Sequence, residues 1–338
     1  MTEYEKKYQE LKNRILNITY DDFEAVAVEL FQFQYEFNNT YKEYCNALKI
    51  DRNYVTSSSQ IPFLPIQFFK SRTIKTGTFE EAAVFESSGT TGSISSKHFV
   101  KDLSIYESSF LQSFTEFYGS ISDYCIIGLL PSYLERKGSS LVYMVDRLIT
   151  LSGRANSGFY LYDFEALKNI LELNEANQQK TLLIGVSYAL LDFSEKFPMQ
   201  LNQTIVMETG GMKGRREELS KQELHKQLKH NFGVNEIHSE YGMTELLSQA
   251  YSKGNGIFNC PPWMKIIVRE LDNPLETMTD FNSSPSLFGG INVIDLANIN
   301  SCCFIATEDA GIVYADGSFE ITGRIEDSDI RGCGLMIV

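Results

Sequence analysis

Residues 181–186 read Thr-Leu-Leu-Ile-Gly-Val, an apolar run with the length of one buried strand. Residues 124–131, Tyr-Cys-Ile-Ile-Gly-Leu-Leu-Pro, and residues 204–207, Thr-Ile-Val-Met, are runs of the same kind. Residues 164–175 and 217–232 have apolar residues at helical spacing instead. Buried strands that alternate with helices are typical of an α/β sheet covered on both faces. We therefore predict an α/β fold for the middle of the chain.

The chain before this sheet is predicted to be helical. Apolar residues recur at helical spacing from residue 3 to about residue 48. Asp21-Asp22 is a start signal for a second helix, which we expect to end near Leu48. Phe31 and Tyr35 belong to an aromatic stripe on this helix, and we interpret the stripe as core rather than as a ligand site.

The chain after about residue 265 is predicted to form a separate β structure. Short strand-like runs follow one another at residues 265–269, 289–294, 303–306, 312–314 and 319–322. Asp316-Gly317 is a signal for a hairpin turn before the last run. We expect a mainly antiparallel, barrel-like β subdomain.

The composition argues against several classes of protein. The chain has 338 residues, enough for one large domain or two modest ones. Its formal net charge of −14 argues against nonspecific nucleic-acid binding, which depends on Lys and Arg. We find no apolar run of about 18 residues, the length of a membrane span. The acidic start, Met1 to Glu5, is not a signal peptide, so we expect a cytoplasmic protein.

The cysteines are predicted to be reduced thiols rather than metal ligands. They are Cys45, Cys125, Cys260, Cys302, Cys303 and Cys333. They include no C-x-x-C pair, and the four histidines have no spacing typical of zinc sites. We expect Cys302-Cys303 to lie in a strand, with one side chain on each face.

One loop combines hydroxyls, glycines and a cation. It reads Ser87-Ser88-Gly89-Thr90-Thr91-Gly92, and Lys97-His98 follow shortly after. Glycines let successive N–H groups turn toward one centre, and such arrays bind phosphate oxygens. The spacings of the Walker A loop and of the dinucleotide-binding fingerprint are both absent. Taken alone, the loop fits either an anion site or an ordinary surface turn.

A second motif follows about 150 residues later. Tyr241-Gly242-Met243-Thr244-Glu245 combines an aromatic face, a tight turn, a hydroxyl and a carboxylate. Glu245 is a hard oxygen ligand, which magnesium prefers in combination with phosphate oxygens. The alternative interpretation is a helix start, with Thr244 near the cap and Glu245 in the first turn. Both interpretations are compatible, because anion sites are often built at helix N-termini.

These two motifs and several others follow one another along the chain in the same order as in a known superfamily. The others are residues 61–70, Glu208-Thr209-Gly210-Gly211, residues 307–311, Gly323-Arg324 and residues 329–333. Together they resemble the adenylate-forming superfamily, whose members use ATP to activate carboxylic acids as acyl-adenylates. Within it, the chain is most similar to the LuxE-like acyl-protein synthetases of fatty-acid reductase systems. The resemblance covers most of the chain after about residue 60 and implies the large N-terminal domain of that fold, with mixed α/β sheets covered by helices.

The resemblance implies a role for each matching residue. The loop residues Ser87, Ser88, Gly89, Thr90, Thr91 and Gly92 would bind ATP, with Thr90 and Thr91 at the β- and γ-phosphates. Gly210, Gly211 and Tyr241 would flank the adenine, and Gly242 would also belong to the nucleotide site. Thr244 would approach the α-phosphate, and Glu245 would bind Mg²⁺. Asp309 would accept hydrogen bonds from the ribose hydroxyls, assisted by Arg324.

The end of the chain departs from most of the superfamily. Adenylating enzymes usually continue past the Gly-Arg motif into a small domain with a catalytic lysine, which we expect to be missing here, as in LuxE-like proteins. Lys97, His98 and Arg331 are candidates to replace that lysine. Cys333 matches the cysteine that accepts the acyl group, and the nine residues from Arg324 reach up to about 30 Å when extended. Without the resemblance, Cys333 would be read as part of a packed apolar C-terminus.

The resemblance also implies a division of the chain. We predict an N-terminal helical segment (1–60), an α/β nucleotide-binding region (61–262), a β-rich subdomain (263–326) and a short tail with Cys333 (327–338).

The pocket for the acyl group is the part of the site that the sequence indicates least clearly. Gly128 and Gly185, at strand ends, could leave room for an alkyl chain, although residues chosen in this way usually prove to be core.

The sequence therefore predicts an ATP- and Mg²⁺-dependent ligase. It would activate a carboxylic acid, by the family a fatty acid, as an acyl-adenylate and transfer the acyl group to Cys333. The LuxE-like resemblance implies an acyl reductase as partner. Two alternatives remain open: a coenzyme A ligase of the phenylacetate type, and a non-catalytic nucleotide-binding subunit. The acid and the oligomeric state are not determined by the sequence.

Overall fold

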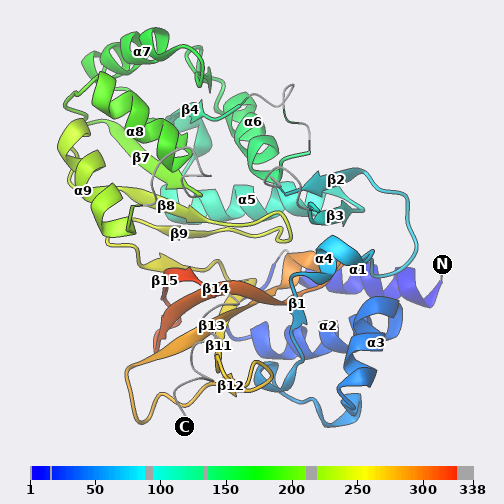
Figure 1. Ribbon diagram of the computed structural model, residues 1–338. Helices are drawn as coiled ribbons and strands as arrows, with labels where there is room; N and C mark the ends of the chain where they lie inside the picture. The colour runs from blue at the N-terminus through cyan, green and yellow to red at the C-terminus, as the bar shows by residue number, and fades with distance from the viewer. Residues whose placement is uncertain are drawn as a thin grey trace. The chain divides into compact units, whose positions relative to one another are not determined.

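The computed structural model describes residues 2–15, 17–87, 94–131, 136, 138–210 and 219–325. The chain divides into two compact units (Figure 1). The first unit consists of the described residues of Met1–Ser109, Thr244–Ser248 and Asn259–Val338, and the second of those of Phe110–Met243 and Gln249–Phe258. Each unit is described by itself below. The domain boundaries predicted from the sequence stay predictions.

The second unit contains the predicted α/β sheet. Its strands are β4 (Cys125–Leu129), β5 (Gly158–Phe159), β6 (Thr181–Gly185), β7 (Thr204–Thr209), β8 (His238–Tyr241) and β9 (Ala250–Ser252). They lie in the order β5-β4-β6-β7-β8-β9, and all neighbouring pairs are parallel except β8 with β9. Every residue of β4 and β6 is buried, as their apolar runs predict. Parallel order places the carboxyl ends of β6, β7 and β8 at one edge.

Helices cover both faces of this sheet. They are α5 (Leu103–Tyr118, in this unit from Phe110), α6 (Ser140–Ser152), α7 (Phe164–Ala176), α8 (Ser187–Lys196) and α9 (Lys221–Phe232), with the 3-10 turn η3 (Ile121–Asp123). Figure 1 shows α8 and α9 on one side of the strands and α6 on the other. A capping box between Ser220 and Glu223 fixes the start of α9, and Gly233 ends it with φ of 62°. The α/β prediction is confirmed.

The first unit contains the predicted antiparallel strands. They are β11 (Met264–Arg269), β12 (Thr277–Met278), β13 (Ser286–Asp295), β14 (Phe304–Tyr314) and β15 (Phe319–Arg324), in the order β12-β11-β13-β14-β15. The short strand β1 (Leu64–Pro65) adds a parallel pairing to β14. The turn at Asp316-Gly317 joins β14 to β15, as predicted, with φ of 85° at Gly317. Among the described residues of this unit the strands form an open path rather than a closed barrel.

Two details of this β structure differ from the prediction. Residues 304–306 and 312–314 belong to one long strand, β14, which has a register shift against β15 between Ala310 and Gly311. Cys302 and Cys303 precede β14 instead of lying in a strand, and both are buried. None of the five described cysteines forms a disulfide.

The N-terminal helices belong to the first unit. They are α1 (Glu3–Ile15), α2 (Phe23–Phe37) and α3 (Asn39–Ala47), followed by the 3-10 turns η1 (Arg52–Tyr54) and η2 (Ser58–Gln60) and by α4 (Phe68–Ser71). The single helix predicted up to Leu48 is interrupted at Asn38, which has extended backbone and whose side chain caps α3 by accepting from the Tyr41 N–H. Phe31 is fully buried, and its ring lies 6.5 Å from that of Phe304. The core interpretation of the aromatic stripe is confirmed for Phe31.

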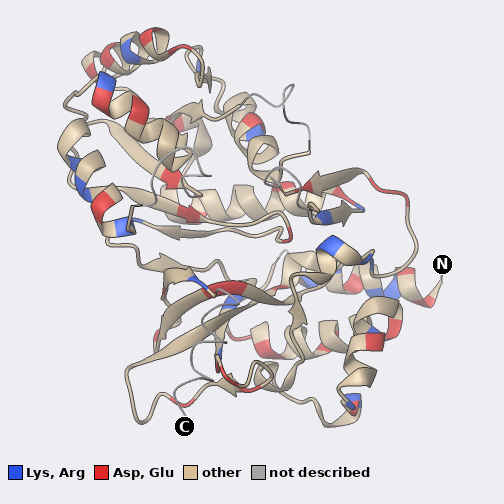
Figure 2. Cartoon of the chain, viewed as in Figure 1, with Lys and Arg blue, Asp and Glu red and all other residues tan. Residues whose placement is uncertain are grey.

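A small two-stranded sheet completes the first unit. It pairs β2 (Ala83–Glu86) with β3 (Lys97–Val100) in antiparallel register, so that Glu86 lies opposite Lys97. The hydroxyl loop joins these two strands. No helix in the described part of the chain is long and apolar enough to cross a membrane. Figure 2 shows both signs of charge on α7 and on α9.

Candidate nucleotide-binding residues

The base of the hydroxyl loop is closed by hydrogen bonds in the first unit. Ser87 donates its N–H to the Ser96 carbonyl at 3.1 Å, and its hydroxyl accepts from the Ser96 N–H at 2.9 Å. Lys97 begins β3, is 56% exposed, and lies 3.5 Å from the carboxylate of Glu86. The phosphate-binding candidates Ser88, Gly89, Thr90, Thr91 and Gly92 lie outside the described residues. The structure therefore fixes the two ends of the loop.

The Thr244-Glu245 turn belongs to the same unit. These residues form a turn without regular helix or strand, so a helix does not begin here, and the helix-start alternative is wrong. Thr244 is half-buried, and Glu245 is only 5% exposed. Burial raises the pKa of Glu245, although a hydrogen bond from Ser96 and the charges of Lys70 and Arg324 oppose this effect. Glu245 is thus a buried carboxylate that an added cation would stabilise.

His98 connects the two motifs. Its Nδ1 lies 2.8 Å from the carbonyl oxygen of Thr244, 146 residues later in the chain. The ring of Phe69 packs edge-on against the imidazole, with the ring centres 6.0 Å apart. Burial lowers the pKa of His98 to about 4, so the imidazole is neutral at pH 7. The proposed replacement of the missing lysine by His98 is not tested by this geometry and stays a prediction.

Asp309 and Arg324 lie opposite each other on β14 and β15. The Arg324 Nε is 4.0 Å from the Asp309 carboxylate, and its Nη2 donates to Glu308 at 2.5 Å. Arg324 itself is 67% exposed. The structure therefore brings together the pair that the family resemblance assigns to the ribose. Glu308, which stands in the same motif, had no predicted role.

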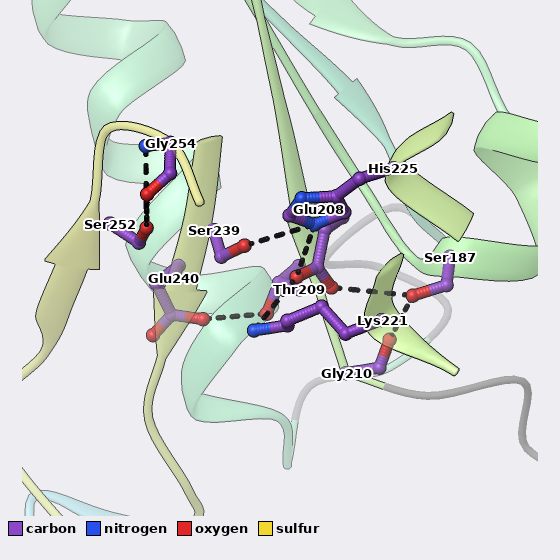
Figure 3. A network of polar contacts seen from close by, with 10 residues as sticks. All are labelled: Ser187, Glu208, Thr209, Gly210, Lys221, His225, Ser239, Glu240, Ser252 and Gly254. Carbon is purple, nitrogen blue, oxygen red and sulfur yellow. Dashed lines mark hydrogen bonds and ion pairs between the residues drawn. The ribbon is translucent and has the colours of Figure 1, made fainter. Parts of the chain in front are cut away.

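The second unit has its own cluster of polar residues at the ends of β7 and β8 (Figure 3). Glu208 is 5% exposed, and its Oε1 lies 3.3 Å from the Lys221 ammonium and 3.5 Å from His225 Nε2. Burial alone would raise the pKa of Glu208, but His225, Lys221 and Ser239 together bring that pKa below its ordinary value. Glu208 is therefore ionised at neutral pH. The sequence interpretation missed its partners on α9, because only the fold places them beside β7.

The residues next to Glu208 fix the end of β7. Ser187, the first residue of α8, donates its hydroxyl to the Gly210 carbonyl at 2.5 Å. Gly210 has φ of 69°, a conformation that favours glycine. Thr209 donates to Glu240 on β8 at 2.5 Å. Burial raises the pKa of Glu240 to about 7, and the neighbouring charge of Glu208 adds to this effect.

Tyr241 ends β8 and is 9% exposed. Its ring meets that of Phe258 at 60°, with the centres 5.9 Å apart, and Lys221 Nζ lies 4.3 Å from the centre of the Phe258 ring. A Cβ at Gly242 would lie 2.4 Å from Oε1 of Glu240, so a larger residue there would have to displace that carboxylate. The tyrosine face predicted to stack on a purine is thus held by packing within the second unit.

Some predicted features lie elsewhere. Gly211, Cys333 and Arg331 lie outside the described residues.

The two glycines predicted to leave room for an alkyl chain are closely packed instead. The space beside Gly128 is filled by Phe159, and the space beside Gly185 is filled by Leu129 and Leu190. No group of three or more His, Cys, Asp or Glu in the described ranges could hold a metal ion. A metal bound at Glu245 would therefore need further ligands, such as phosphate oxygens.

Comparison with known proteins supports the predicted relationship. Residues 11–127 match the model of the family described as acyl-protein synthetase, LuxE. No curated protein matches the chain. The resemblance to the acyl-protein synthetases is thus confirmed for these residues.

Solved structures of adenylate-forming enzymes have the same fold. ATP-bound MatB from Rhodopseudomonas palustris matches with a TM-score of 0.55 and 15% identity, over 74% of this chain and 49% of that one. FadD1 from Archaeoglobus fulgidus, a long-chain-fatty-acid-CoA ligase, matches with a TM-score of 0.50 and 14% identity, over 75% and 53%. The chain thus spans about half the length of these proteins. At such identities the likeness concerns the fold, and the predicted adenylate-forming architecture is confirmed.

Proposed function

We propose that this chain, a relative of the LuxE acyl-protein synthetases with the adenylate-forming fold, is a ligase that activates a carboxylic acid with ATP. The observation that carries the proposal is the contact between two distant motifs. His98 and Ser96, at the end of the hydroxyl loop, contact Thr244 and Glu245, which lie about 150 residues later. A loop rich in hydroxyls beside a buried carboxylate suits a polyphosphate with a divalent cation.

Several residues of the first unit have roles in this proposal. The hydroxyl loop, from Ser87 to Gly92, would bind the β- and γ-phosphates, and Thr244 would donate to the α-phosphate. Glu245 would hold Mg²⁺ together with phosphate oxygens, and its buried carboxylate fits such a cation. When bound, Mg²⁺ would offset charge on the phosphates. Lys97, which is exposed beside the loop, would add a positive charge.

The first step transfers AMP to the acid. A carboxylate oxygen of the acid forms a bond to the α-phosphorus, and the bond from that phosphorus to the bridging oxygen breaks, so that pyrophosphate leaves. Donors already in place at the phosphates would stabilise the developing charge. Asp309 and Arg324 would bind the ribose, and Gly210, Gly211 and Tyr241 would flank the adenine, as the family resemblance assigns them; Gly242 would belong to the same nucleotide site.

The second step is proposed from the family resemblance alone, because residues 326–338 lie outside the described residues. The thiolate of Cys333 would attack the acyl carbonyl, forming a thioester and releasing AMP. Arg331 could lower the pKa of this thiol. The acyl group, by the same resemblance a fatty acyl group, would then pass to a partner acyl reductase.

The test is the intact mass of the protein after incubation with Mg-ATP and a panel of fatty and aryl acids. We expect a gain equal to one acyl group, which neutral hydroxylamine removes and which Cys333→Ser lacks. Acid-dependent exchange of radioactive pyrophosphate into ATP should persist in Cys333→Ser, because the first step does not use the thiol. Cys260→Ser is the control variant.

Two results would contradict the proposal in different ways. Acid-dependent release of AMP only when coenzyme A is present, unaffected by Cys333→Ser, would replace the protein thioester by a coenzyme A ligase reaction. ATP binding without pyrophosphate exchange for any acid in the panel would contradict the ligase itself and favour a nucleotide-binding subunit.

A further inference from the structure

The turn that contains Thr244 and Glu245 has no secondary structure to hold it. Residues 242–249 form neither helix nor strand, although Thr244 to Ser248 are mostly buried. Buried backbone N–H and C=O groups need hydrogen-bond partners, and a segment outside helices and sheets lacks the repeating backbone–backbone bonds that would provide them. The partners here come from side chains of the same unit.

Three buried polar side chains supply these hydrogen bonds. His98 Nδ1 contacts the Thr244 carbonyl at 2.8 Å, and Asn298 Nδ2 donates to the Glu245 carbonyl at 2.7 Å. Asp295, at the end of β13, accepts from the Leu247 N–H at 2.7 Å; it also accepts from the N–H and hydroxyl of Ser248. All three side chains are at most 1% exposed.

His98 differs from the other two in where it comes from. It is the second residue of β3 and directly follows Lys97, whereas Asp295 is the last residue of β13 and Asn298 lies in the 3-10 turn η4 (Leu296–Asn298) that follows it. A carbonyl oxygen can only accept, so His98 Nδ1 carries the hydrogen. The imidazole thus joins the strand after the hydroxyl loop to the backbone between the Thr244 hydroxyl and the Glu245 carboxylate.

We propose that His98 is a positioning residue, whose Nδ1–H holds the Thr244 carbonyl and thereby orients Thr244 and Glu245 toward the nucleotide phosphates and Mg²⁺. The inference rests on the proposed function, because it concerns the same site. It assigns His98 an action through another residue instead of the place of the missing lysine. His98 is buried and packed against Phe69, which suits a fixed donor better than a group that meets the reacting atoms.

The test uses two replacements that differ in the position of one donor. The amide nitrogen of asparagine can occupy the place of Nδ1, whereas that of glutamine corresponds to Nε2. His98→Asn should therefore keep the bond to the Thr244 carbonyl, and His98→Gln should lose it. His230→Gln, at an exposed position of α9, is the control.

We expect His98→Gln to raise the KM for Mg-ATP in pyrophosphate exchange by about 10-fold, the effect of one lost buried hydrogen bond, with the KM for the acid unchanged. His98→Asn should stay within about 3-fold of the wild type on the same scale. Calorimetric titration should show weaker ATP binding by His98→Gln, with a larger loss of affinity in Mg²⁺ than in EDTA, because the contact of Thr244 with the α-phosphate does not need the metal. Amide exchange of residues 244–248 should be faster in His98→Gln.

The outcomes separate this inference from the proposed function. A wild-type protein that binds no Mg-ATP would remove the proposed function, and this inference with it. If the wild type is active and both variants have the same KM for Mg-ATP, the positioning role is wrong while the ligase stands. Equal loss of affinity for acid and ATP, with a lower melting temperature in both variants, would reduce His98 to a packing role.

Discussion

The carboxylate of Glu208, at the end of β7, lies 3.3 Å from the ammonium of Lys221, the first residue of α9. Glu208 is buried, whereas the Lys221 side chain is 33% exposed. The same carboxylate faces His225 one helical turn further along α9. This pair connects the strand that leads into Gly210 to the helix that precedes β8. A replacement of Lys221 therefore tests how the contacts at the end of β7 affect stability, and it leaves every residue assigned to the nucleotide unchanged.

Removing the charge of Lys221 should destabilise the protein. Lys221→Met keeps most of the apolar stem over the Phe258 ring but leaves Glu208 buried with only His225 and hydroxyl partners. We expect the free energy of unfolding to fall by about 1–2 kcal/mol, less than for a fully buried pair because water reaches Lys221. Urea unfolding followed by circular dichroism measures this change.

Lys168→Met is the matched control for this prediction. Lys168 pairs with Glu172 on α7 at 3.3 Å, and both side chains are at least 35% exposed. Its loss should change the free energy of unfolding by less than about 0.5 kcal/mol. Equal effects of the two replacements would mean that the burial of Glu208 does not matter.

Glu240 predicts a dependence of stability on pH. Its pKa is about 7 in the folded protein, raised chiefly by burial from the ordinary value of 4.5 for a glutamate side chain. In the window between these values, the folded state binds the proton and the unfolded state has released it. The contribution of Glu240 to stability is therefore present at low pH, is lost as the pH rises from 4.5 to about 7, and amounts to about 3 kcal/mol at most.

Glu240→Gln isolates this effect. Glutamine keeps an oxygen to accept from Thr209 but does not titrate. We expect the variant to gain stability relative to the wild type as the pH rises from 5 to 8. Melting temperatures of both proteins across this range give the comparison. If the difference in melting temperature between the variant and the wild type did not change with pH, Glu240 would have an ordinary pKa in the folded protein.

Much of the fold could be predicted because local pattern and final structure agree. The apolar runs at 181–186 and 204–207 became β6 and β7, since strands buried on both faces need continuous apolar sequence. The turn at Asp316-Gly317 was readable because short hairpin loops often need a glycine with positive φ, and Gly317 has φ of 85°. Such signals are contained in a few consecutive residues.

The differences arise where distant residues decide the structure. Residues 307–309, Thr-Glu-Asp, interrupt the apolar pattern of β14, yet they continue the strand. Arg269 on β11 donates to the Thr307 carbonyl at 2.5 Å, and the Thr307 hydroxyl donates to Ile291 at 2.8 Å, so buried partners replace apolar packing. In the same way, no local pattern pairs His98 with Thr244, because the fold brings them together across 146 residues.

Glu245→Gln should impair the use of Mg²⁺. The replacement keeps the volume of a buried side chain and removes its charge, so the proposed Mg²⁺ would lose its carboxylate ligand. We expect acid-dependent pyrophosphate exchange to fall by about 100-fold and the half-saturating Mg²⁺ concentration to rise. Titration of MgCl₂ at fixed ATP measures both.

The control for Glu245 is Glu43→Gln, at an exposed position of α3 in the same unit. It should leave the exchange rate and the Mg²⁺ requirement unchanged. If Glu245→Gln lowered the rate at every Mg²⁺ concentration without shifting the half-saturation point, the metal role would be wrong. Glu245 would then act through the shape of its turn.

The Asp309–Arg324 pair predicts how the protein selects its nucleotide. If Asp309 accepts hydrogen bonds from the ribose hydroxyls, 2′-deoxy- or 3′-deoxy-ATP should support pyrophosphate exchange about 10-fold less efficiently than ATP. Asp309→Ala should lower kcat/KM for ATP and largely abolish this preference, because the variant has no carboxylate to accept from the ribose hydroxyls of any of the three nucleotides. Asp272→Ala, at an exposed position of the same unit, should preserve it. A variant that loses activity equally with all three nucleotides, while Arg324 keeps its bond to Glu308, would mean that Asp309 shapes the strand pair rather than reading the ribose.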